Sequence, residues 1–200
     1  MSRLVLASGN AGKLTEFREL FAGEGVEILA QGELGVGAVE ETGATFVENA
    51  ILKARHAARA SGLPALADDS GLCVAHLGGA PGLRSARYAG SHGDDAANNR
   101  KLLAALEGVP EDSRDAFFIC VLVLLRHADD PAPLIAEGRW HGSILAAPRG
   151  SHGFGYDPLF LPAGEMQSSA ELDPERKNMF SHRGQALVRL QMLLADAPLA

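Results

Sequence analysis

The stretch that most constrains the fold is AFFICVLVLL, residues 116–125, in which ten apolar residues follow one another without a polar break. A membrane-spanning helix needs roughly 20 apolar residues, so this run is far too short to cross a bilayer. It is rich in β-branched and aromatic residues and apolar at every position, which is typical of a strand buried on both faces. We therefore expect residues 116–126 to form the central strand of a covered sheet.

The rest of the chain alternates between helix and strand patterns. Helices are expected at 13–21, 45–60, 94–106, near 175–179 and at 183–194, and further strands at 3–7, 26–29 and 135–144. Early alternation followed by adjacent strands predicts an α/β fold with a mixed sheet, in which the segment 135–144 has an antiparallel partner. Because 200 residues contain no repeat and no long linker, residues 1–200 are expected to form a single domain.

The charge balance argues against a nucleic-acid-binding protein. The chain has 18 Lys and Arg against 25 Asp and Glu, a formal net charge of -7. Binding to a duplex needs a basic face, whereas a small polyanion needs only local cations or a metal ion held by carboxylates.

Cys73 and Cys120 lie among apolar residues, as reduced core thiols do, and no signal peptide is visible. We expect a cytoplasmic protein without nucleic-acid or membrane partners.

The segment LVLASGNAGKLTEF, residues 4–17, joins an expected strand to an expected helix through a small polar turn. It is not a Walker A loop, because Ala7 stands where the first glycine is required and Leu14 where the Ser or Thr is. Lys13 in the first helical turn is unfavourable for the helix dipole unless an anion lies over the same helix end. Two interpretations stay open, a phosphate site and an ordinary tight turn with a solvated lysine.

Two pairs of adjacent acids stand out. Glu40-Glu41 precede the expected helix at 45–60, on which Lys53 is expected on the polar face, and Asp68-Asp69 interrupt the stretch PALADDSGLCVAHL at 64–77. We expect that stretch to form two extended segments around a tight acidic corner. Mg²⁺ binds through one or two carboxylates plus substrate phosphates, and a carboxylate free of metal can accept a proton from water. The alternative is that the acids only cap a helix or a turn.

Two late segments carry aromatic and basic side chains. GFGYDPLF, residues 153–160, places Phe154 and Tyr156 among glycines, where aromatic rings can stack on a base or anchor the loop on the core. ERKNMFSHRGQA, residues 175–186, supplies Lys177, His182 and Arg183 before an apolar helix. Such groups can bind phosphates or a base edge, or they can form a solvated helix start.

Taken together, four segments resemble one protein family. They are ASGNAGK at 7–13, EETGATFVENAILKAR at 40–55, ADDSGL at 67–72, and GFGYDP at 153–158 with SHRGQAL at 181–187. The chain resembles the inosine/xanthosine triphosphate pyrophosphatases, which act on noncanonical purine nucleoside triphosphates, over nearly its whole length. The resemblance implies an elongated mixed-sheet α/β fold of two lobes with a central active-site cleft, a homodimer and Mg²⁺. It also implies hydrolysis of ITP, dITP and XTP to the monophosphate and pyrophosphate, which sanitises the nucleotide pool.

The resemblance also implies roles for individual residues. Asp69 would accept a proton and, with Glu41, hold the metal ion, and Lys13 would act in catalysis. Glu40 and Asp68 are neighbours whose share in metal binding stays open. The substrate would be bound by Ser8, Gly9, Asn10, Ala11, Gly12, Lys13, Ser70, Phe154, Gly155, Tyr156, Asp157, Lys177, His182 and Arg183.

Two other functions stay open at this point. One is a pyrophosphatase for another class of nucleotide, and the other is a non-catalytic module that binds a nucleotide. The acids Glu41 and Asp69 favour an enzyme over a binding module. Among purines, a pocket whose donors face position 6 would accept hypoxanthine and xanthine, whereas adenine would leave each donor unpaired at a cost of about 1–3 kcal/mol.

Overall fold

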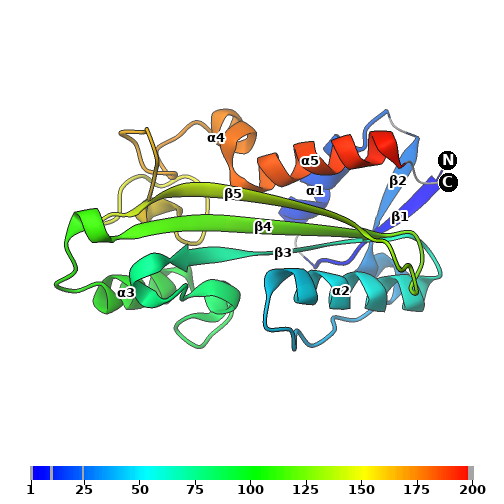
Figure 1. The fold of residues 1–200 in the computed structure, drawn as a ribbon, viewed down its shortest axis with the longest axis horizontal. Coiled ribbons are helices and arrows are strands. Elements are labelled where there is room, and N and C mark those ends of the chain that lie inside the picture. Colours follow the sequence, from blue (N-terminus) through cyan, green and yellow to red (C-terminus); the bar gives the residue numbers. More distant parts are fainter. Residues whose placement is uncertain (1, 10, 24, 198–200) are drawn as a thin grey trace. The chain divides into compact units, whose positions relative to one another are not determined.

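The computed structural model describes residues 2–9, 11–23 and 25–197. These residues form a six-stranded sheet in the order β2-β1-β3-β4-β5-β6 (Figure 1). The strands are β1 (Ser2–Leu6), β2 (Val26–Ala30), β3 (Ala65–Val74), β4 (Asp115–Leu125), β5 (Leu134–Ile144) and β6 (Phe160–Pro162). The helices are α1 (Ala11–Leu20), α2 (Phe46–Ser61), α3 (Asp95–Ala105), α4 (Pro174–Phe180) and α5 (His182–Asp196).

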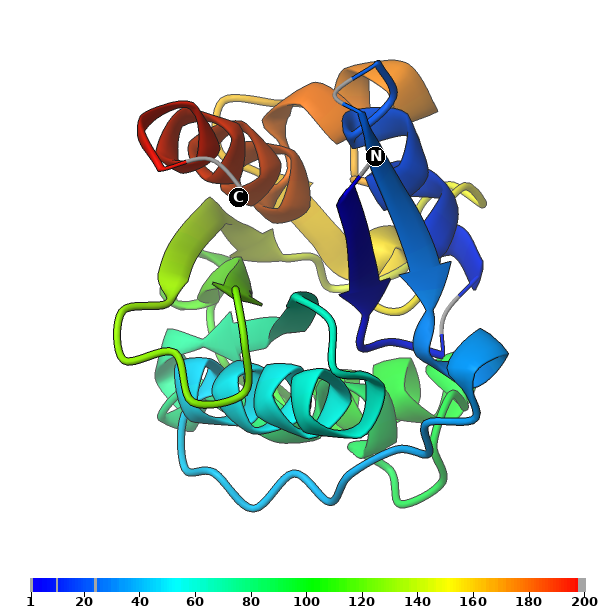
Figure 2. The ribbon, with the colours of Figure 1, turned by 90° about the vertical axis from the view of Figure 1, so that its right-hand side faces the viewer.

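The sheet is mixed, as the sequence predicts. β1 runs parallel to both β2 and β3, whereas β5 and β6 are antiparallel. From β1 the chain steps outward to β2 through α1 and then back across to β3 through α2. Because parallel crossovers are right-handed, two steps in opposite directions place their helices on opposite faces of the sheet. Figures 1 and 2 show α1 and α2 on opposite faces of these strands. The predicted α/β fold with a mixed sheet is confirmed.

β4 is the strand that the apolar run predicts. Every residue from Phe118 to Leu125 is buried, and the strand lies between β3 and β5. Complete burial of a large aliphatic or aromatic side chain contributes about 1.5–3 kcal/mol, so this one strand supplies a large part of the hydrophobic stabilisation. No helix in the described part of the chain is long and apolar enough to cross a membrane.

The chain divides into two compact units. The first comprises Met1–Asp69, Val121–Glu137 and Ala186–Ala200, and the second comprises Ser70–Cys120 and Gly138–Gln185. β3, β4 and β5 each contribute residues to both units, so the chain passes from one to the other several times. The division falls between Asp69 and Ser70, within β3, and therefore distributes the predicted site residues over both units. A central cleft stays a prediction.

Small residues bring α2 close to the strands of the first unit. Ala50, Ala54 and Ala57 recur at helical spacing and have no exposed surface. Leu6 of β1 and Phe17 of α1 are buried to the same degree. Alanine has no side-chain rotamers to lose, so this packing costs little conformational entropy. It holds α2, and the polar residues on its edges, firmly against the sheet.

The second unit is built around aromatic residues. The ring of Phe160 lies 4.8 Å from that of Phe118 and 5.2 Å from that of Trp140, measured between centroids. Leu102 and Leu106 of α3 belong to the same buried cluster. The two cysteines, Cys73 and Cys120, both belong to this unit and are buried free thiols, as predicted. The aromatic cluster gives α3 a rigid support beside the loop that precedes β6.

The expected acidic corner at residues 68–69 is wrong. Ala65–Val74 form one uninterrupted strand, and both acids lie within it and are buried. The prediction assumed that two adjacent carboxylates cannot be accommodated in a buried strand, because an unpaired buried charge is costly. They are accommodated here because each acid has a lysine partner from a helix.

Candidate active site

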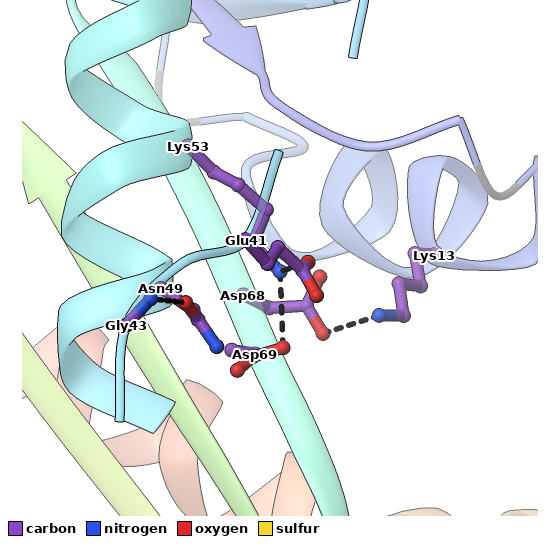
Figure 3. Close-up of polar contacts among 7 residues, drawn as sticks. All are labelled: Lys13, Glu41, Gly43, Asn49, Lys53, Asp68 and Asp69. Carbon is purple, nitrogen blue, oxygen red and sulfur yellow. Dashed lines mark hydrogen bonds and ion pairs between the residues drawn. The ribbon is translucent and has the colours of Figure 1, made fainter. Parts of the chain in front are cut away.

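Asp68 and Asp69 take their charge partners from opposite sides of β3. Adjacent residues of a strand point to opposite faces of the sheet, and α1 and α2 lie on opposite faces here. Asp68 is paired with Lys13 from α1, and Asp69 is paired with Lys53 from α2 (Figure 3). Two neighbouring acids therefore connect one strand to both helices of the first unit.

The ion pair with Lys13 neutralises the more deeply buried acid. Nζ of Lys13 lies 2.5 Å from Oδ2 of Asp68, whose side chain is 1% exposed. An isolated carboxylate at that depth would be costly, and the ammonium group compensates it. The interpretation of Lys13 as a solvated lysine is therefore wrong. Its position in the first turn of α1 is explained by the acid that it faces.

Lys53 joins two carboxylates from separate segments. Its Nζ lies 2.7 Å from Oε1 of Glu41 and 3.0 Å from Oδ1 of Asp69, so these two acids meet at one ammonium group. Sequence reasoning missed Lys53 and placed it on the polar face of its helix. A signal was present, because Lys53 follows the buried Asn49 by four positions and therefore lies on the same helical face.

Burial and charge act against each other at this cluster. Burial raises the pKa of Asp69 above its ordinary value; Lys53 opposes the rise, and Glu41 and Asp68 add to it. Burial acts to lower the pKa of Lys53, but the surrounding carboxylates outweigh it and raise that pKa above its ordinary value. Lys53 therefore stays charged, while Asp69 is a stronger proton acceptor than an exposed aspartate.

One oxygen of Asp69 is available to a ligand. Oδ2 is buried, and no donor among the described residues contacts it. Buried polar atoms are nearly always bonded, so such an exception indicates a site for an ion, a water molecule or a substrate. With Glu41 it offers hard oxygen ligands of the kind that Mg²⁺ prefers.

The described chain contains no group of three or more His, Cys, Asp or Glu side chains able to hold a metal. An ion here would need further oxygen ligands. Glu40 is exposed, and its share in metal binding stays a prediction.

The segment that carries Glu41 is fixed against the start of α2. Thr45 caps the helix by accepting the N–H of Glu48, and Oδ1 of Asn49 accepts the N–H of Gly43 at 2.8 Å. A Cβ on Gly43 would lie only 2.7 Å from Oδ1 of Asn49, so no larger residue fits without a shift. Sequence reasoning identified neither Gly43 nor Asn49, and both help to place Glu41 beside Lys53.

The predicted phosphate-binding turn follows β1. Ser8 is half-buried and Gly9 is exposed, whereas Asn10 lies outside the described residues. Ala11 and Gly12 form the start of α1. Lys13, in the first turn of that helix, reaches Asp68 of β3. The phosphate-binding roles of the turn stay predictions.

The second unit contains the loop predicted to bind the nucleoside. Phe154 is 62% exposed, and Nζ of Lys177 lies 5.6 Å from the centre of its ring. Tyr156 is instead buried in the aromatic core, and its hydroxyl donates to the carbonyl oxygen of Ser85 at 2.8 Å. Burial raises the pKa of Tyr156 further above neutrality. The loop-anchor interpretation therefore describes Tyr156, whereas the ring of Phe154 is accessible for stacking.

Asp157 organises the same loop from within. It is 4% exposed, and its carboxylate accepts the N–H of Phe154 and the hydroxyl of Ser169, each at 2.8 Å. It also forms an ion pair with Lys177 at 2.5 Å. Asp157 thus ties Lys177 and Phe154 together, and its predicted contact with the nucleoside stays a prediction.

His182 and Arg183 begin α5 and are anchored in the second unit. The ring of His182 stacks on Phe118, with centroids 4.9 Å apart and planes 14° apart, and Arg183 is buried. The alternative of a solvated helix start is wrong for these two residues. Ser70 of β3 is half-buried. The roles of all three in substrate binding stay predictions.

The predicted site residues thus form two groups, each within one unit. In the first unit, the structure brings together Lys13, Glu41, Asp68 and Asp69 and adds Lys53 to them. In the second unit, it brings together Phe154, Asp157 and Lys177. The first group combines carboxylates with ammonium groups, as a site for phosphates and a cation requires. The second group presents an aromatic ring beside a cation, as a site for a base requires.

Comparison with known proteins places this chain in a family. The model described as the Ham1 family matches residues 4–193. A dITP/XTP pyrophosphatase of Xanthomonas campestris pv. campestris is 61% identical over 191 residues, 96% of each chain. Another from Escherichia coli O157:H7 is 57% identical over 197 residues, 98% of each chain. The structure of a HAM1 protein from Coxiella burnetii has a TM-score of 0.94 at 52% identity, covering 98% of this chain and 100% of the other. The likeness extends over sequence, fold and nearly the whole length, and the chain belongs to the Ham1 family.

Proposed function

We propose that this chain hydrolyses the noncanonical purine nucleoside triphosphates dITP, XTP and ITP to the monophosphate and pyrophosphate. The observation that carries the proposal is the cluster at β3. There, Lys53 joins Glu41 to Asp69, whose Oδ2 has no partner among the described residues, and the neighbouring Asp68 pairs with Lys13. The relatives described above are named dITP/XTP pyrophosphatases and match nearly the whole chain. The reaction removes noncanonical nucleotides from the pool that supplies nucleic-acid synthesis.

A divalent cation, proposed to be Mg²⁺, would be held by Glu41 and Asp69, with Glu40 and Asp68 as neighbouring acids. The fit rests on the available oxygen of Asp69 and on a donor set made only of carboxylates. When bound, the ion would offset negative charge on the phosphate oxygens and on the departing pyrophosphate. The remaining chemistry belongs to side chains of this unit.

Asp69 is proposed as the acceptor of the proton from the attacking water. The water oxygen forms a bond to the α-phosphorus, the bond from that phosphorus to the oxygen bridging to the β-phosphate breaks, and the proton passes to the carboxylate. A general base works best when its pKa is near the working pH, and burial raises the pKa of Asp69 in that direction. Lys53 uses Oδ1, so Oδ2 is available.

Lys13 and Lys53 are proposed to bind the phosphate oxygens. Both ammonium groups now neutralise carboxylates of the first unit. A triphosphate would give them new anionic partners, and the carboxylates would then become available as oxygen ligands. Such an exchange of partners keeps every buried charge compensated, which a site for a highly charged substrate requires.

Selection among purines is proposed to take place in the second unit. Phe154 offers an exposed ring for stacking, and Lys177 lies beside it. A donor that faces position 6 of the purine is satisfied by the oxygen of hypoxanthine or xanthine and left unpaired by adenine. Each unpaired donor costs about 1–3 kcal/mol, so several together reject ATP strongly. Rejection of GTP requires a further exclusion at its 2-amino group.

The test is a substrate panel. The purified full chain is incubated with Mg²⁺ and dITP, ITP, XTP, ATP, GTP or a pyrimidine triphosphate, and pyrophosphate release is measured. We expect rapid release from the first three nucleotides and slow release from the others. Phosphorus NMR that detects stepwise orthophosphate release would contradict cleavage between the α- and β-phosphates. Preference for the pyrimidine triphosphate would indicate another substrate class, and binding without turnover would indicate a non-catalytic module.

We also propose that the chain is a homodimer, as the resemblance implies. Sedimentation equilibrium of the purified protein at micromolar concentration is expected to give twice the mass of one chain. The mass of a single chain over the whole concentration range would contradict the proposal. A cytoplasmic location stays a prediction, and fractionation of cells that produce the tagged chain would check it.

A further inference from the structure

Two side chains of α3 bind the backbone of one residue, Gly155, in the loop at 153–157. Oδ2 of Asp95 accepts the N–H of Gly155 at 2.7 Å, and Nδ2 of Asn99 donates to the carbonyl oxygen of the same residue at 2.8 Å. The two side chains are four positions apart and therefore lie on one face of α3. Both backbone polar groups of Gly155 are thus bound to a single helix, and we call Asp95 and Asn99 the α3 clamp.

Gly155 lies between two aromatic residues of opposite exposure. Phe154 is 62% exposed, whereas Tyr156 is 3% exposed. Gly155 has a φ of +61°, in the left-handed region that other residues rarely adopt, so the chain turns sharply here. The orientation of the backbone at Gly155 therefore determines the direction in which the ring of Phe154 leaves the loop.

The other anchors of the loop act on either side of Gly155. Asp157 accepts the N–H of Phe154, and the hydroxyl of Tyr156 donates to Ser85. Neither of these contacts restrains the carbonyl oxygen or the N–H of Gly155. Within the part of the chain that the structure describes, those two groups are bound by the α3 clamp.

Asn99 is a poor choice for stability alone. Its Oδ1 is buried and has no hydrogen-bond partner among the described residues. A leucine of similar size would remove this unpaired acceptor, but it would also leave the carbonyl oxygen of Gly155 without its donor. The amide is explained instead by the hydrogen bond that it donates to Gly155.

We infer that Asp95 and Asn99 are positioning residues, which fix the backbone of Gly155 so that Phe154 is presented to the purine base of the substrate. The inference rests on the proposed function, because it takes Phe154 as the residue that stacks on the base. A ring that points elsewhere weakens binding of the base. It leaves the side chains at β3, which act on the phosphates, unchanged.

Asp95→Ala removes one half of the clamp, and Asp95→Asn keeps an acceptor oxygen for the N–H of Gly155. We expect Asp95→Ala to raise the KM for ITP about tenfold with kcat within about twofold, and Asp95→Asn to return KM close to the wild-type value. Asn99→Leu removes the donor to the carbonyl oxygen of Gly155 and is expected to raise KM about threefold. Unchanged KM in both Asp95→Ala and Asn99→Leu, or a fall in kcat at constant KM, would overturn the inference.

Asp94→Ala is the matched control. Asp94 is the neighbouring acid, and its carboxylate accepts the N–H of Ala97 as the cap of α3. This variant weakens the start of the helix without removing either bond to Gly155. We expect a lower midpoint of thermal unfolding with unchanged KM. A rise in KM as large as that of Asp95→Ala would assign the effect to helix stability and reject the clamp.

Two further measurements separate the clamp from the proposed function. Hydrogen exchange at the amide of Gly155 needs no turnover, and we expect it to be about tenfold faster in Asp95→Ala than in Asp94→Ala. Equal exchange rates would overturn the clamp.

Inorganic tripolyphosphate carries no base, so its inhibition constant is expected to be the same in wild type and Asp95→Ala. A wild-type chain that releases no pyrophosphate from any purine triphosphate would contradict the proposed function, whatever the exchange rates.

Discussion

Asp69 and Asp130 are both buried acids of the first unit, but their surroundings are opposite. Asp130, in the turn after β4, is 2% exposed and accepts the N–H groups of Arg126 at 3.0 Å and Ala132 at 2.9 Å. Its carboxylate also pairs with the guanidinium of Arg126 at 3.0 Å. Asp69 is 9% exposed and is bonded to Lys53 through Oδ1, while Oδ2 has no partner among the described residues.

The two surroundings move the pKa values of these acids in opposite directions. Burial acts to raise the pKa of Asp130, but hydrogen bonds from Arg126 and Ala132 outweigh it and lower that pKa below its ordinary value. For Asp69, burial prevails and raises the pKa. A carboxylate surrounded by donors is stabilised as an anion and serves the fold, whereas one with an open oxygen keeps its capacity to react. The two acids differ in their hydrogen bonds: both oxygens of Asp130 accept donors, whereas Oδ2 of Asp69 has no partner among the described residues.

Asp69→Asn gives the largest effect that the comparison predicts. We expect kcat to fall about 10²- to 10⁴-fold, because the proton acceptor is lost. The free energy of unfolding should be unchanged or higher, because a neutral amide is less costly to bury than a carboxylate. Pyrophosphate release measures the first quantity, urea unfolding the second, and calorimetry with dITP checks that the nucleotide still binds. A variant with near wild-type kcat would remove Asp69 from the mechanism.

Lys53→Met tests whether the same cluster accepts a cation. Without the ammonium group, Glu41 and Asp69 repel each other, so we expect the free energy of unfolding to fall by about 1–3 kcal/mol and kcat/KM to fall about 100-fold. Added Mg²⁺ is expected to restore stability more in Lys53→Met than in wild type, as urea unfolding with and without the ion would measure. Lys53→Arg is the control that keeps the charge. An equal response to Mg²⁺ in all three chains would contradict the proposed metal site.

Asp130→Ala is expected to show the reverse pattern. Loss of an acid that accepts three hydrogen bonds should lower the free energy of unfolding by about 2–3 kcal/mol, because their donors are left unpaired. The kcat per folded molecule should not change. Asp129→Ala is the control, since Asp129 is exposed and pairs with Arg59 at the surface, and its effect should stay within about 0.5 kcal/mol. If Asp130→Ala lowered kcat while leaving stability intact, the contrast with Asp69 would fail.

The smallest expected effect is a pH dependence of stability. The pKa of Asp130 is lower in the folded chain than in the unfolded chain, so its contribution is fully present above the unfolded value of about 3.9. It is lost as the pH falls from there through the folded pKa. We expect the free energy of unfolding of Asp130→Asn to depend less on pH below about 4 than that of wild type. Parallel urea-unfolding curves across this range would show that Asp130 does not contribute in this way.

The elements with local patterns could be predicted from the sequence. β4 and α2 follow from apolar residues at strand and helix spacing, because burial leaves a signature within each segment. β3 was predicted incorrectly because the lysines that allow its acids to be buried come from other segments. The sequence around Asp68 and Asp69 contains no pattern that predicts their ion pairs with Lys13 and Lys53.

The site was predictable where a motif carries it and not where tertiary contacts create it. Glu41 and Asp69 were identified. Lys53 was placed on the polar face of its helix because Glu41, which pairs with it, lies in a loop outside the helical pattern. The position of that loop depends on the hydrogen bond from the N–H of Gly43 to Oδ1 of Asn49. The α3 clamp was missed for the same reason, since its partner Gly155 is far away in the sequence.

β3 assigns the two neighbouring acids to different helices by strict alternation. Deleting one residue between Ala65 and Ala67 would invert the strand from that point onward, so that Asp68 would face α2 and Asp69 would face α1. Each carboxylate would then meet the other lysine, and the open oxygen would move to the wrong side of the sheet. The position of each acid along this one strand therefore decides which lysine it meets, just as the identity of the acid does.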